Sequence, residues 1–250
     1  MSPIILAGTS FALILGSTIL GTLLRARLPE QHLTGDSKEV IRLATALIAT
    51  MSALVLALLF ASTRSSFEQT SGYVSRLTAD VTELDELLTE YGPETAPLRK
   101  ALRDEIGPLV DSIWREAATQ RGRQQPTAKS HSETVVYMLR ALQPRTAVQR
   151  SLQARALLVS TDMSQIRLTL FAQPANSISM TFVTVLVLWL MFIFATFGMS
   201  AAPNVTLITV LCICVLSASG AIYLILELAQ PFDGLMQIPN DSLRRALASL

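Results

Sequence analysis

Four long hydrophobic runs stand out along the chain, separated by segments rich in polar residues. They cover residues 3–24, 41–62, 178–199 and 205–229, and none carries a charge in its middle third. Each is close to or above the roughly 20 residues that a helix needs to cross about 30 Å of hydrocarbon. The first run does not resemble a secretory signal, because its first charge, Arg25, comes after the apolar stretch. The pattern predicts four transmembrane helices.

The stretch between the second and third runs, residues 63–176, has the pattern of a water-soluble helical bundle. Its first part carries apolar residues spaced as at the a and d positions of a heptad. These positions are Phe67, Val74, Leu77, Val81, Leu84, Leu88 and Tyr91. Gly92-Pro93 predicts the end of that helix. Because no strong breaker separates Ser62 from Phe67, the second membrane helix can run on into the heptad as one long rod.

Three further helical stretches follow the heptad. Residues 94–120 form the first, with a predicted interruption at Gly107-Pro108, and residues 132–142 and 146–172 form the other two. No stretch alternates between apolar and polar residues in the manner of a strand. The tail continues with a helix stop at Pro231 and a short helix over residues 243–250.

The predicted fold class is therefore all-α, with the four membrane helices in a 2+2 arrangement. The predicted domains are a transmembrane hairpin (1–62), an extramembrane helical bundle (63–176), a second transmembrane hairpin (177–230) and a tail (231–250). Composition agrees with a chain that largely faces lipid. Half of the 250 residues are hydrophobic and 16% are charged, whereas soluble domains carry about 25% charged residues.

Charge excludes one class of partner and leaves two interpretations of the bundle. The net charge is +1, and the basic residues form no long block, so the sequence indicates no nucleic-acid partner. Residues 80–116 hold ten acidic residues, while residues 121–167 hold eight basic and two acidic ones. This division indicates either complementary faces of packed helices or an electrostatic vestibule for an ion.

The sequence contains no recognisable catalytic constellation. The two histidines, His32 and His131, lie in separate polar loops, and phosphate-loop, nucleophile-elbow and HExxH motifs are absent. Cys212 and Cys214 lie in an apolar run and point about 200° apart on a helix, so we expect small apolar fillers there. We expect no enzyme activity, no cofactor and no metal site.

The second hydrophobic run carries a stripe of distinctive composition on one helical face. At about 100° per residue, the stripe contains Thr45, Ala49, Ser52, Leu56, Leu59 and Thr63. Such a face can line a wet path with an apolar constriction that gates by dewetting. It can equally pack against other helices, because small and hydroxyl residues permit close approach. The first run carries comparable small-residue patterns, Ala12-xxx-Gly16 and Ser17-xxx-Gly21.

The end of the fourth run has the most specific local sequence. It reads Glu227-x-x-x-Pro231-Phe232-x-Gly234, and Asn240-Asp241-x-Leu243 follows. Pro231 should stop the membrane helix, Phe232 can tuck into the bundle and Gly234 permits a turn. Asn240 or Asp241 can cap the short helix of the tail.

Together with the order of the four runs, this tail resembles the bestrophin-like family of bacterial membrane proteins, which is distantly similar to the bestrophin anion channels. The resemblance extends over essentially the whole chain, and further motifs support it. They are Tyr91-Gly92-Pro93-Glu94 with Arg99, Trp114, Trp189, Phe197-Gly198 and Pro203-Asn204.

The resemblance implies a pentameric anion channel whose second membrane helix lines the pore, with both termini and the bundle in the cytoplasm. Carried over by position, the pore face comprises Thr45, Ser52, Leu56, Leu59 and Phe60, and the helical stripe adds Thr63. The tail residues form the junction between the fourth helix and the cytosolic layer. These are Glu227, Pro231, Phe232, Gly234 and Asp241. The acidic run that binds calcium in animal bestrophins has no counterpart, since Asp233 and Asp241 are isolated.

Two function hypotheses follow from these patterns. The first is a homo-oligomeric, channel-like protein of the bacterial inner membrane that passes a small ion, an anion by resemblance. The second is a membrane-anchored structural or interaction protein whose bundle binds a partner without ion conduction. The second hypothesis predicts that the stripe of the second membrane helix is packed and dry.

Overall fold

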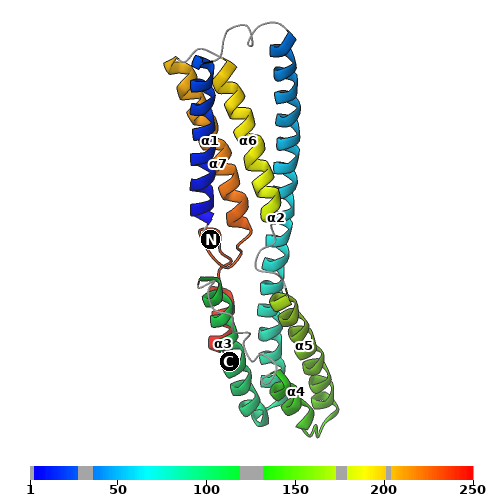
Figure 1. Ribbon diagram of the computed structural model, residues 1–250. Helices are drawn as coiled ribbons and strands as arrows, with labels where there is room; N and C mark the ends of the chain where they lie inside the picture. Colours follow the sequence, from blue (N-terminus) through cyan, green and yellow to red (C-terminus); the bar gives the residue numbers. More distant parts are fainter. Residues whose placement is uncertain (1–2, 28–35, 119–131, 173–178, 201–203, 250) are drawn as a thin grey trace. The chain divides into compact units, whose positions relative to one another are not determined.

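The computed structural model describes residues 3–27, 36–118, 132–172, 179–200 and 204–249, and most of these residues lie in helices (Figure 1). No strand occurs among them. The helices, in chain order, are α1 (Pro3–Arg27), α2 (Asp36–Tyr91), α3 (Ala96–Ala118), α4 (Ser132–Ala141), α5 (Ala147–Ala172), α6 (Met180–Ser200), α7 (Val205–Leu228) and α8 (Asp241–Ser249). A 3-10 turn, η2 (Pro93–Thr95), directly precedes α3.

Four of these helices are long and apolar enough to cross a membrane, as the sequence predicts. They are α1, α2, α6 and α7. The predicted spans differ from the helices by only a few residues at most ends, and α2 is the exception. It continues without a break from the second span to Tyr91, which confirms the single rod. Its 56 residues, at about 1.5 Å each, give about 84 Å, so more than half of α2 must lie outside about 30 Å of hydrocarbon.

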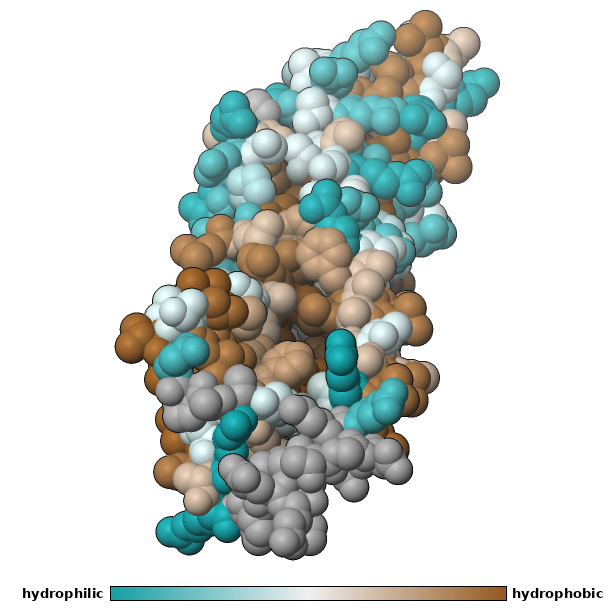
Figure 2. Space-filling model, turned by 90° about the horizontal axis from the view of Figure 1, so that it is seen from above, coloured by the Kyte–Doolittle hydropathy of each residue, from teal (hydrophilic) through white to brown (hydrophobic). Residues whose placement is uncertain are grey.

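The chain forms two compact units. The membrane unit comprises residues 1–66 and 176–229, and the bundle unit comprises residues 67–175 and 230–250. The sequence prediction places the corresponding boundaries after residues 62, 176 and 230. Figure 2 shows hydrophobic residues gathered over one part of the face that it views and hydrophilic residues over another.

In the membrane unit, α1 packs against both α6 and α7. The approach of α1 to α6 is closest at two glycines, Gly21 and Gly198. A Cβ atom on Gly21 would collide with the Ala195 carbonyl, and one on Gly198 would lie 2.5 Å from the Thr18 carbonyl oxygen. The small-residue pattern ending at Gly21 therefore does serve close helix contact. A Cβ atom on Gly16 would have no atom within 4 Å. The pattern Ala12-xxx-Gly16 therefore makes no close helix contact at Gly16.

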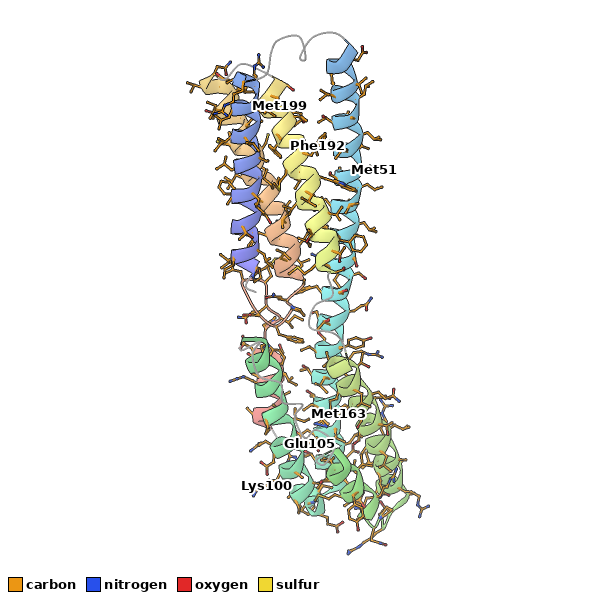
Figure 3. All side chains as sticks on the ribbon, in the orientation of Figure 1. Met51, Lys100, Glu105, Met163, Phe192 and Met199 are labelled. Atoms are coloured by element: carbon orange, nitrogen blue, oxygen red, sulfur yellow. The ribbon has the colours of Figure 1, made fainter. Side chains whose placement is uncertain are left out.

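The bundle unit encloses the larger apolar core, which α2, α3, α4, α5 and α8 share. The heptad prediction is confirmed there, because the six positions from Val74 to Tyr91 are all at most 6% exposed. Phe67, at the start of the heptad, is partly buried. Figure 3 places Met163 of α5 and Glu105 of α3 within this unit, and Met163 belongs to the core itself.

The predicted interruption of the third helix is wrong. α3 runs unbroken through Gly107 and contains Pro108 in its interior. Proline removes one backbone hydrogen bond at a cost of about 3 kcal/mol. Leu98, Leu102 and Ile106 on one side of Pro108 and Val110 on the other are all 1–2% exposed in the shared core. Burial of this stripe on both sides of the proline explains why the helix continues.

The end of α2 follows the predicted glycine stop. Gly92 has φ 130°, a backbone conformation that residues with a Cβ rarely adopt. The Thr95 hydroxyl then donates to the carbonyls of Leu88 (2.6 Å) and Gly92 (2.7 Å), which satisfies backbone acceptors at the end of the helix.

Candidate functional site: the α2 seam and the tail loop

The predicted pore stripe lies on the inner side of α2, against other helices of the same membrane unit. Thr45, Ser52 and Thr63 are 6%, 4% and 2% exposed. Leu56 and Leu59 are partly buried in an apolar cluster with α1, α6 and α7. Within one subunit, therefore, these five residues make a helix-packing surface.

The hydroxyl groups of this surface mostly bond within the protein. Thr45 Oγ1 donates to the Ile41 carbonyl at 2.7 Å and lies 3.3 Å from Thr196 Oγ1 of α6. Thr63 Oγ1 lies 2.8 Å from the Leu59 carbonyl oxygen. The buried Ser52 Oγ forms no hydrogen bond with the part of the subunit that the structure describes.

The outer side of α2 in the membrane unit is open and apolar. Its large apolar members are Val40, Leu43, Leu47, Met51, Leu54 and Leu58, each at least half exposed. Phe60 is 46% exposed, but it follows Leu58 by two residues and therefore points to a different side of the helix, next to the inner stripe. In the most apolar 18-residue stretch of α2, only 11% of the residues are buried. The corresponding shares in the other three spans are 22–39%. Among the four candidate spans, α2 is thus the least covered by its own subunit.

The inner stripe continues into the bundle core as one seam with a seven-residue repeat. We call this face the α2 seam. Residues at seven-residue intervals mark it, namely Ala49, Leu56, Thr63, Thr70, Leu77, Leu84 and Tyr91, and it includes the flanking Thr45, Ser52, Val81 and Leu88. From Thr63 onward every member is buried. The stripe of the second run and the heptad of the bundle are thus a single face of one helix.

Glu227, the first residue of the predicted junction, is a buried carboxylate near the end of α7. It is 3% exposed, and the Tyr223 hydroxyl one turn earlier hydrogen-bonds to it. The helix ends at Leu228, one residue earlier than the predicted span. An acid is costly to bury without a partner, so the tyrosine hydroxyl helps to satisfy it.

The rest of the junction motif forms a loop held by Trp114. Phe232 meets the Trp114 ring edge-on, with centroids 5.2 Å apart. Trp114 Nε1 donates to the Ile238 carbonyl at 3.0 Å, and the Ile238 amide donates to the Pro231 carbonyl at 2.8 Å. Phe232 does tuck into the bundle, as predicted. The anchoring role of Trp114 is new, although a partly buried indole N–H generally needs an acceptor.

The tail then leads into α8, which begins at Asp241, two residues before the predicted helix. Gly234 permits the turn, since its φ is 88°. Leu243, which is 1% exposed, inserts into the core of the bundle unit. The Arg244 amide donates to the Asn240 carbonyl at 2.9 Å, so Asn240 contributes the first helical hydrogen bond through its backbone.

The acidic and basic segments of the bundle form ion pairs with one another. Arg155 pairs with Glu83 at 2.6 Å, Arg145 approaches Glu94 at 4.0 Å, and Arg167 pairs with Glu105. The last pair is the most buried, with side chains 12% and 7% exposed. These pairs favour the interpretation of packed, complementary faces for the described part of the bundle.

Within the described residues, no group of three or more His, Cys, Asp or Glu side chains is arranged to hold a metal ion. Cys212 and Cys214 are both exposed on α7, in the apolar span. In the loop between α7 and α8, Gly234, Leu235, Met236 and Gln237 are exposed.

Comparison with known proteins places this arrangement in a family. A sequence profile of the Bestrophin-like domain matches residues 11–243, from within α1 to the third residue of α8. No curated protein and no solved structure gives a significant match. Because the profile spans nearly the whole chain, including most of α1, all of α2, α6 and α7, and the α7–α8 loop, this protein belongs to the Bestrophin-like family.

Proposed function

We propose that the protein is a homo-oligomeric, channel-like membrane protein in which α2 lies at the subunit interface and lines a path for small ions. The observation that carries the proposal is the open outer face of α2, which the subunit itself leaves uncovered. An oligomer of this chain would cover part of this face. By resemblance to bestrophins, the oligomer is a pentamer and the ion is an anion.

Burial of Thr45, Ser52, Leu56, Leu59 and Thr63 inside the subunit moves the proposed pore lining to the opposite side of α2. Leu54 and Leu58 form the proposed lining, and Phe60 leaves it because it points away from Leu58. A ring of such residues around a narrow axis is a hydrophobic constriction, which can close by expelling water. The proposed setting is the bacterial inner membrane, with both termini and the bundle in the cytoplasm. No enzymatic activity is part of the proposal.

The test is an anion-flux assay on the purified protein in liposomes. Leu54→Ala and Leu58→Ala should each increase flux at least several-fold, because they widen and wet the constriction. Leu56→Ala is the matched control: it lies on the packed face, so it should lower thermal stability without increasing flux. Absence of flux in the wild type and in both open-face variants would exclude a pore along this face.

The second candidate is a membrane-anchored structural or interaction protein, and one observation favours it. The stripe of hydroxyl residues on α2 is buried, and the large side chains on the outer face of α2 are apolar. This is what is expected of a helix whose outer face contacts lipid. This matches the packed stripe that this hypothesis predicts.

Cysteine accessibility separates the two candidates. In a Cys212→Ser, Cys214→Ser background, Leu54→Cys and Leu58→Cys should react with a membrane-impermeant thiol reagent if α2 lines a wet path. If both positions stay unreactive in liposomes while Tyr137→Cys, on the exposed side of α4, reacts readily, lipid contact without conduction is the better account.

A further inference from the structure

The loop between α7 and α8 has a closed, well-defined form. The Asp233 amide donates to the Gln230 carbonyl at 3.2 Å, and the Ile238 amide closes the loop on Pro231. The Asp233 carboxylate accepts a hydrogen bond from the Gly234 amide at 2.8 Å. The backbone therefore holds the residues at the tip in place.

The apolar side chains of this loop point in two different directions. Phe232 contacts Trp114 and Ile238 is 5% exposed, so both face the bundle unit. Leu235 is 85% exposed and Met236 is 42% exposed. Leu235 is the most exposed of the large hydrophobic side chains that the structure describes. Two adjacent apolar residues at a tip that is itself held by hydrogen bonds suggest a contact outside the subunit.

Chain connectivity identifies the surface within reach. The 24 residues of α7 span about 36 Å, which exceeds about 30 Å of hydrocarbon, so its end reaches the headgroup layer. Leu235 follows Leu228 by seven residues, which limits their separation to at most about 25 Å. The loop is thus the first part of the chain to leave the fourth span, and it carries an apolar tip.

We propose that Leu235 and Met236 insert into the boundary between lipid headgroups and acyl chains, next to the end of α7. The occupant of this surface is therefore lipid, and the loop acts as an interfacial anchor in the manner of apolar side chains on membrane-surface segments. Through Trp114 the same loop holds α3, so the anchor ties the bundle unit to the bilayer surface. This inference goes beyond the proposed function, and it requires only that α7 spans the membrane.

The experiment places a fluorescent probe at the tip of the loop in the full-length protein. Leu235→Cys is made in the Cys212→Ser, Cys214→Ser background, labelled with an environment-sensitive fluorophore and reconstituted in phosphatidylcholine–phosphatidylglycerol vesicles. Part of the lipid carries a spin label near the headgroup as quencher. We expect blue-shifted emission and loss of most of its intensity with spin-labelled lipid, and the same for a probe at Met236→Cys.

Two controls test the assignment to lipid. A probe at Tyr137→Cys, which is 75% exposed on α4, should keep its emission in the same vesicles. With Leu235→Asp added, a probe at Met236→Cys should lose most of its quenching, because inserting a carboxylate into the interface is unfavourable. Folding of each variant is checked by gel filtration.

Emission at position 235 like that of a probe in water, unchanged by the quencher, would overturn the proposal. Blue-shifted emission without lipid quenching would also overturn it, because a second copy or another protein would then cover the tip. Neither result bears on ion flux, so failure of the anchor and failure of the channel proposal are distinguishable.

Discussion

The two halves of α2 have opposite polarity around the same seam. In the membrane unit the seam carries the hydroxyl groups of Thr45, Ser52 and Thr63, and the outer face carries leucines. In the bundle unit the seam carries Val81, Leu84 and Leu88, each at most 1% exposed, and the outer face carries exposed acidic residues such as Glu86 and Glu90.

This reversal shows that the solvent, and not the helical period, decides what a packed face is made of. In water an apolar seam drives association, because burial removes it from the solvent. In lipid both faces can be apolar, so helices associate through close packing and hydrogen bonds, for which small and hydroxyl residues are suited. Thr45 and Thr63 remain acceptable in the membrane because their hydroxyls bond to the preceding turn of the helix.

The largest expected effect comes from comparing the same substitution, leucine to alanine, at a buried position in the bundle half of α2 and on the outer face of its membrane half. Leu84→Ala should cost about 2–5 kcal/mol of unfolding free energy, because it leaves a cavity in a fully buried core position. Leu58→Ala, at 68% exposed, should cost less than about 1 kcal/mol. Denaturant titration in detergent measures both. Equal costs would mean that the outer face of α2 is already covered in the purified protein.

A second test concerns how the membrane unit is held together. Gly21→Ala should destabilise it by about 1–3 kcal/mol, because the new methyl group would meet the backbone of α6, which cannot move aside as a side chain can. Gly16→Ala on the same helix has open space and should be neutral or stabilising by up to about 1 kcal/mol. Thermal unfolding in detergent compares the two. A neutral Gly21→Ala would contradict the close approach of α1 and α6.

A third test asks whether the hydroxyl groups of the α2 seam serve packing or a wet path. Ser52→Ala removes a buried hydroxyl that has no partner within the described subunit, so stability should rise by up to about 1 kcal/mol. Thr45→Val removes the contact with Thr196 and should cost about 0.6 kcal/mol. If Ser52→Ala instead reduces anion flux in liposomes and leaves stability unchanged, the seam faces water.

The smallest expected effect concerns charge on the bundle half. Burial, followed by repulsion from the carboxylates of Asp162 and Glu83, raises the pKa of Asp80 above its usual range, against the attraction of Arg76 and Arg155. Asp80→Asn should therefore raise the melting temperature slightly at neutral pH, and the gain should shrink at acid pH, where carboxylates are protonated. A lower melting temperature at neutral pH would mean that attraction to the arginines dominates.

Features with a strong period could be predicted from the sequence because each reflects local geometry. The positions of the spans, the heptad of α2 and its continuity from span to bundle all follow from spacing and from the absence of a breaker. The interruption at Gly107-Pro108 could not be judged in this way. Local propensity disfavours a helix there, and only the burial of Leu102, Ile106 and Val110 in the shared core reverses the balance.

Some features of the candidate site could likewise be predicted from local sequence, and others could not. The order of the tail motif indicates the family, and Phe232 could be assigned to the bundle because a bulky aromatic after a helix stop needs cover. The direction of the stripe on α2 could not be assigned, since a face of small and hydroxyl residues suits both a wet path and a helix contact. Trp114 was recognisable only as a family-like residue, because its partner, Ile238, lies 124 positions away in the chain.

By itself, the sequence determined the all-helical class, the four apolar spans and the rod that links the second span to the bundle, because period, length and hydropathy are local properties. Only the tertiary structure decided which side of that rod packs against the rest of the subunit, that α3 continues unbroken through Pro108, and that Trp114 holds the tail. Each of these depends on which surfaces meet. The local sequence determines the composition of a helical face, but what packs against that face depends on contacts between residues far apart in the chain.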